Sequence, residues 1–172
     1  MSELHAAPGS ALRIWTYKDP STVLARFAHD LCFELTDLEL SVRQDGERLE
    51  VALRLAPRGL RLLGSAQGEA LTPVKPKDQT EIERTARDAV LEVGRHPEVR
   101  FEGAGPAAAI QGTLHLHGQA RPLTVACAQV DGRWRGEALL TPSAWGIKPY
   151  RAFLGALKLA DRVRVTWDVA LV

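Results

Sequence analysis

Apolar and polar side chains alternate with a period of two in several short segments of the chain. The three clearest segments are residues 27–35, 49–55 and 163–171. Successive side chains of a strand point to opposite faces of its sheet, so this pattern predicts half-buried antiparallel strands. Asp-Gly pairs at 45–46 and 131–132 lie between such segments and predict tight hairpin turns. Many short antiparallel strands favour a β-sandwich or a β-barrel.

Size and charge narrow the class of protein. The chain has 172 residues, a net charge of +1 and 45% hydrophobic residues, so we expect one domain over residues 1–172. A disordered chain would be less apolar or more highly charged, and a nucleic-acid-binding protein would usually be strongly basic. No apolar run is long enough for a transmembrane segment. We therefore expect neither nucleic acid nor a membrane span among its interactions.

The first residues and the cysteines indicate a compartment. The chain begins without a basic stretch followed by an apolar core, so we expect no secretory signal and a cytoplasmic protein. Strand phase places Cys32 on an outward face and Cys127 on an inward face. We expect two free thiols, because such side chains rarely meet and the cytoplasm is reducing.

One segment has helical spacing instead. Apolar residues at 82, 86, 89, 90 and 93 form a stripe, which predicts a helix over about residues 80–93. Thr80 and Glu83 have the spacing of a capping box at its start, and Gly94 is expected to end it. The sequence therefore predicts a mainly β domain with one helix.

The second half contains an ordered series of motifs: HPEVRF at 96–101, GTLHLHGQARP at 112–122, SAWGIKP at 143–149 and ADRV at 160–163. Together they resemble the YceI-like family, over roughly Ala25 to the C-terminus. The resemblance implies an elongated, lipocalin-like antiparallel β-barrel, for which we expect eight strands and one covering α-helix. It also implies a carrier or sequestering protein for polyisoprenoid-type lipids, which holds the lipid in an apolar tunnel.

The inward faces supply the candidate ligand-binding residues. Apolar side chains of a small barrel either fill it or surround a cavity, and the resemblance favours a cavity. We expect a bound isoprenoid, quinone or fatty-acyl lipid and no other cofactor. The candidate lining residues are Phe27, Leu31, Phe33, Phe101, Leu114, Leu116 and Trp167.

Two further residues are candidates for headgroup contacts. His29 lies in the inward phase of an apolar strand, where it would bond either a ligand headgroup or a backbone carbonyl or water. Trp145, with Tyr150, Lys148 and Arg151 nearby, could form a basic, aromatic rim at a barrel mouth. The basic residues could instead simply keep a loop soluble.

No catalytic motif is present, so we expect a binding protein that is not an enzyme. Two alternatives remain open: a small barrel enzyme with His29 as general base, or an interaction module, as a possible homodimer that uses Trp134 or Trp145 on its surface.

The histidines at the end of the 110–118 segment do not by themselves predict a metal site. His115 and His117 are two residues apart and would share an outward strand face. Two imidazoles do not make a metal site, and a third ligand would have to come from His96 or an acidic residue. We therefore expect solvated histidines and no metal site.

Overall fold

Antiparallel strands make up most of the molecule. The computed structural model describes residues 2–172, apart from the side chain of Phe153. Its strands belong to one 13-stranded sheet. They are β1 (Glu3–His5), β2 (Ala11–Lys18), β3 (Asp30–Leu35), β4 (Leu38–Asp45), β5 (Arg48–Leu55), β6 (Arg61–Gln67), β7 (Ala70–Thr72), β8 (Val99–Pro106), β9 (Ile110–Leu116), β10 (Gln119–Val130), β11 (Arg133–Leu140), β12 (Arg151–Ala152) and β13 (Leu157–Val169).

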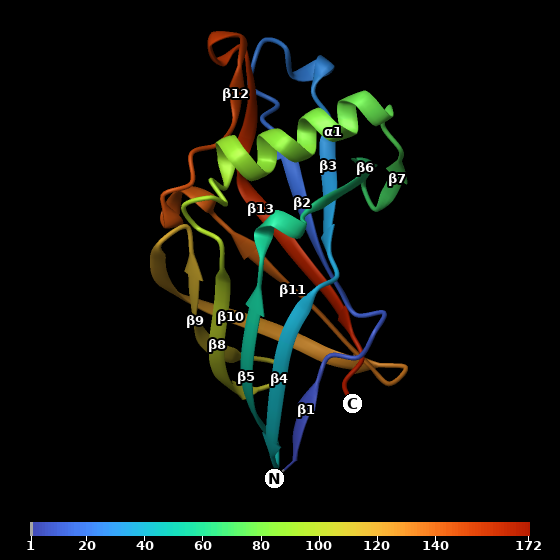
Figure 1. Cartoon of the computed structure of the whole chain (residues 1–172), viewed down its shortest axis with the longest axis vertical. Coiled ribbons are helices and arrows are strands. Elements are labelled where there is room, and N and C mark those ends of the chain that lie inside the picture. The colour runs from blue at the N-terminus through green and yellow to red at the C-terminus, as the bar shows by residue number, and fades with distance from the viewer. Residues whose placement is uncertain (1) are drawn as a thin grey trace.

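The sheet follows the order β1-β4-β5-β8-β9-β10-β11-β13-β2-β3-β6-β7, with β12 paired to β13. Every pairing is antiparallel, as the alternation predicts, but the expected count of eight strands is not confirmed. The molecule is elongated, and both termini lie near the same end (Figure 1). There β1 pairs with β4, and the chain beyond it forms an isolated bridge between Ala6 and Leu171. The N-terminal segment therefore links β4 to the C-terminal end of the chain.

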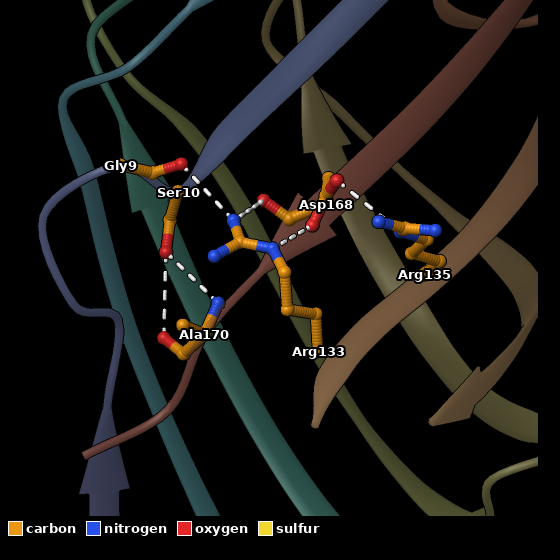
Figure 2. A network of polar contacts seen from close by, with 6 residues as sticks. All are labelled: Gly9, Ser10, Arg133, Arg135, Asp168 and Ala170. Carbon is orange, nitrogen blue, oxygen red and sulfur yellow. Dashed lines mark hydrogen bonds and ion pairs between the residues drawn. The ribbon is translucent and has the colours of Figure 1, made fainter. Parts of the chain in front are cut away.

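A polar network supports this end of the molecule (Figure 2). The guanidinium of Arg133 bonds the carboxylate of Asp168 and donates to the Gly9 carbonyl at 3.1 Å. Ser10 Oγ donates to the Ala170 carbonyl and accepts its N–H. Arg133 and Arg135 hold the pKa of Asp168 below its ordinary value. The network thus connects the turn before β2 to β11 and to the C-terminal end of β13.

The helix begins and ends earlier than the sequence predicts. The α-helix α1 (Pro76–Arg84) continues as a π-helix, η3 (Thr85–Val90). Proline suits the first helical position because its φ is already helical, so the helix begins at Pro76 and the expected capping box at Thr80 does not form. The left-handed residue after the helix is Glu92 (φ +49°), in place of Gly94.

The remaining helices are short 3₁₀ turns: η1 (Ala25–Phe27), η2 (Pro57–Gly59), η4 (Pro142–Trp145) and η5 (Phe153–Gly155).

Side chains of the helix bond the backbone of β6 and the residue before it. Leu62 N–H donates to the Glu83 carboxylate at 2.8 Å, and Gln79 donates to the Leu62 carbonyl at 3.3 Å. One helical turn further, Arg87 donates to the Leu60 carbonyl. Unpaired backbone groups at a sheet edge invite other strands to pair there. The helix crosses the strands in Figure 1 and covers this part of β6. Its side chains bond backbone groups with which another strand could otherwise pair.

Two groups of buried apolar side chains form the core. One centres on β4, β5, β8 and β9 and includes Val42, Leu49, Phe101, Ile110, Leu114 and Trp145. The other lies beneath the helix and includes Phe33, Leu35, Leu55, Leu60 and Leu62. Within residues 2–172, no helix is long and apolar enough to cross a membrane.

Candidate ligand-binding cavity

An apolar cavity of about 340 Å³ lies inside the sheet, between the two core groups. On β5, the lining side chains are the alternate residues Leu49, Val51, Leu53 and Leu55. On β13 they are Val163, Val165, Trp167 and Val169, again every second residue. The cavity is therefore built from the inward phase of the strands, and its volume falls in the usual range for small-molecule pockets.

Two aromatic side chains stay at the cavity wall because each packs over a glycine of the neighbouring strand. Trp167 on β13 pairs with Gly136 on β11, and a Cβ placed at Gly136 would lie 2.5 Å from the indole ring. Likewise, a Cβ at Gly112 on β9 would lie 2.6 Å from the ring of Phe101 on β8. Each ring thus occupies the space that a neighbouring side chain would take. This packing keeps two large side chains out of the centre of the cavity.

The cavity lining contains one hydroxyl group, that of Thr16 on β2. Its Oγ1 is buried and has no hydrogen-bond partner within the described residues. An unpartnered buried polar group costs about 1–3 kcal/mol, so most such groups are bonded internally. Thr16 therefore carries a polar atom just behind the cavity wall whose hydrogen-bonding capacity the described residues leave unused.

We expect Thr16→Val to stabilise the ligand-free protein by about 1 kcal/mol, because it removes an unpartnered hydroxyl from an apolar surface. Urea unfolding with an unchanged m-value would measure this. Thr166→Val is the matched control, since Thr166 Oγ1 accepts a 3.0 Å hydrogen bond from Trp15 Nε1. At Thr166 the same substitution should lower the free energy of unfolding, because it removes this hydrogen bond. Equal changes in unfolding free energy at the two positions would contradict the conclusion that Thr16 Oγ1 is unpartnered.

Five of the sequence-predicted binding residues line the cavity: Phe33, Phe101, Leu114, Leu116 and Trp167. They come from β3, β8, β9 and β13, which the topology brings around one space. Their contact with a ligand stays a prediction. What the structure adds is that all five face the same cavity.

Three other predicted residues do not line it. Phe27 is 62% exposed on η1, and His29 is exposed in the segment before β3. The expectation that they point inward is wrong, because the chain forms a 3₁₀ turn there and the strand begins only at Asp30. Leu31 is half-buried against the core beneath the helix, outside the lining.

The two tryptophans considered for a surface or rim role are also placed differently. Trp145 is buried, and its Nε1–H donates to the Leu114 carbonyl at 3.0 Å, so it belongs to the core and not to a rim. Trp134 lines the cavity from β11. The interpretation that either indole lies on an exposed surface is therefore wrong.

Several lining residues were not selected from the sequence. Leu38, Leu40 and Val42 of β4 alternate as clearly as the chosen segments, and that signal could have identified them. Ala86 and Val90 belong to the predicted helical stripe, but only the tertiary structure shows that the helix faces the cavity.

Both cysteines are free, as expected, but the expectation that Cys32 faces away from the core is wrong. Cys127 lines the cavity, whereas Cys32 is fully buried outside it. Burial raises the pKa of the Cys32 thiol to about 11 and also raises the pKa of Cys127. Neither thiol has the lowered pKa of a reactive cysteine.

The expectation that His115 and His117 share a solvated strand face is wrong. Strand β9 ends at Leu116, and His117 adopts a left-handed conformation (φ +53°) in the following turn. Its side chain is only 11% exposed and forms a 2.9 Å contact between Nε2 and Glu92 Oε2. The two histidines therefore do not share a solvated strand face.

The sequence matches the model of one protein family, the YceI-like domain, over residues 65–171. The chain belongs to the YceI-like family. No curated protein matches the sequence at a significant level. The matched region begins in β6 and contains the helix and strands β7 to β13.

Solved structures extend the comparison of this YceI-like chain to nearly its whole length. BcnA of Burkholderia cenocepacia is similar with a TM-score of 0.66 and 13% identity, covering 97% of this chain and 99% of its own. A polyisoprenoid binding domain from Saccharophagus degradans, described as implicated in plant cell wall breakdown, has a TM-score of 0.59 and 14% identity, covering 98% and 97%. At these identities, the likeness shows the fold alone.

Proposed function

We propose that this YceI-like protein binds the hydrocarbon chain of an isoprenoid or quinone-type lipid in its cavity, without chemical conversion. The observation that carries the proposal is the lining: inward aliphatic and aromatic side chains from both halves of the sheet surround one space, with a single unpartnered hydroxyl. Apolar surface of this kind favours hydrocarbon over water.

The energetics favour a long apolar ligand. Each buried methylene contributes about 0.8 kcal/mol, so chain length alone can supply affinity without a set of polar contacts. The buried Thr16 Oγ1 would have to rotate toward the cavity to be reached, and it would then provide one hydrogen bond to an alcohol or a quinone carbonyl.

The isoprenoid class is supported by the comparison with the Saccharophagus degradans protein, which is described as a polyisoprenoid binding domain. A fatty-acyl chain offers the same methylene chemistry and is the competing ligand to test. The enzyme alternative loses its basis, because His29 is exposed and does not line the cavity. Cytoplasmic location, a single domain and self-association stay predictions.

The direct test is native mass spectrometry of the protein purified from its own host, followed by organic extraction. We expect an adduct that extraction releases as an isoprenoid or quinone. Protein that arrives ligand-free and takes up neither farnesol nor ubiquinone at micromolar concentration would overturn the proposal. Release of a fatty acid alone would overturn the isoprenoid assignment but keep a lipid in the cavity.

A further inference from the structure

Three potential metal ligands meet where the helix ends. Glu92, His96 and His117 each offer one ligand atom, and these atoms all lie within 4.8 Å of one another. The rings of His96 and His117 have centroids 4.3 Å apart, and His117 Nε2 lies 2.9 Å from Glu92 Oε2. All three side chains are partly buried.

The backbone brings these ligands together from two segments. The Glu92 carbonyl accepts the N–H of His96 at 2.9 Å, so both residues belong to one tight turn after the helix. His117 comes from the turn between β9 and β10. The next residue, Gly118, has no side chain and so leaves room for the His96 ring. A Cβ at Gly118 would lie 3.1 Å from the His96 ring.

We propose that Glu92, His96 and His117 bind one Zn²⁺ ion, with the fourth position left to water or another small ligand. Two imidazoles and one carboxylate are an established zinc ligand set, with metal–ligand distances of about 2.0–2.2 Å. Tetrahedral ligands at these distances lie about 3.3 Å apart, so shifts of about an ångström would bring the three atoms into place.

The interactions already present do not oppose binding. His117 Nε2 would exchange its contact with Glu92 for the ion, and the negative charge of Glu92 is retained. Glu92 Oε1 also pairs with Arg95 at 3.4 Å, but that arginine is 77% exposed and the pair is weak. The ring nitrogens of His96 have no hydrogen-bond partner in the described part of the chain that would have to be given up.

The three proposed zinc ligands lie next to residues of the cavity wall. Leu91 and Leu116, which immediately precede Glu92 and His117, both line the cavity. The ion would therefore lie beside the cavity wall and would tie the end of the helix to the β9–β10 turn. It is independent of the lipid, so its test does not require the proposed function to hold.

The test is titration of the untagged protein with ZnCl₂ against a chromogenic chelator. We expect one equivalent bound with micromolar or tighter affinity, and no competition from Mg²⁺, which prefers oxygen ligands. His96→Ala and His117→Ala should each weaken binding about 100-fold or more. Saturating zinc should raise the Tm of the parent protein by about 5 °C or more and leave that of the His96→Ala protein unchanged.

Two further variants keep the proposal falsifiable if an alanine variant folds poorly. Glu92→Gln preserves the hydrogen bond to His117 but removes the anionic ligand, and should weaken zinc binding at least 10-fold. His115→Ala removes a histidine of the same hairpin that is outside the cluster, and should bind zinc as the parent does. No binding below millimolar zinc, or equal losses in His115→Ala and His96→Ala, would overturn the proposal.

Discussion

Gly136→Ala should destabilise the protein by about 2–3 kcal/mol and sharply reduce lipid binding. A Cβ at Gly136 would overlap the Ala126 carbonyl oxygen and lie 2.5 Å from the Trp167 ring. Both β11 and the indole would have to move, and overpacking of this kind commonly costs 1–3 kcal/mol. The indole would move away from the wall into the space reserved for a ligand. Urea unfolding and titration with a fluorescent fatty acid measure the two effects.

Gly94→Ala is the matched control for this substitution. A Cβ at Gly94 meets no atom within 4 Å and requires no unusual backbone conformation. Alanine there should leave stability and binding unchanged or raise stability slightly, because it restricts the unfolded chain. If Gly136→Ala behaved like Gly94→Ala, the explanation of how Trp167 is held at the wall would be wrong.

Ala138→Phe should abolish most lipid binding while leaving the protein folded. Ala138 is 8% exposed and lines the cavity from β11, so the added ring would extend into empty space. Displacing about four methylenes of a ligand at about 0.8 kcal/mol each would weaken binding roughly 200-fold. Filling an existing cavity often stabilises a protein, so we expect no loss of unfolding free energy. The same fluorescent titration, with farnesol as competitor, measures the change.

The next residue along the strand provides the control. Leu139 is 73% exposed because alternate side chains of β11 point in opposite directions. Leu139→Phe adds a similar ring to the outside and should leave binding unchanged. Equal binding in the two variants would place the lipid somewhere other than this cavity.

Much of the cavity wall could be predicted from local pattern. The alternating residues of β5 and of the 163–169 part of β13 line it as their phase indicates, because both stretches are regular strand. The register shift of β13 lies before the second stretch, between Leu159 and Val163. The predictions for Phe27 and His29 were wrong for a local reason. The strand begins at Asp30, and residues before it do not follow the alternation of its two faces. The prediction for Trp145 was wrong for a tertiary reason, because its indole N–H donates to the Leu114 carbonyl on strand β9.

The sequence by itself determined the class of fold, the antiparallel pairing and the inward phase of the regular strands, because these follow from neighbours two residues apart. Only the tertiary structure decided that the interior is open, because that depends on glycines such as Gly136 lying directly across from aromatic rings on other strands. It alone also brought Glu92 and His117 together, from turns 25 residues apart in the chain. Contacts of this kind depend on strand register and on where the helix ends, and short-range periodicity does not determine either.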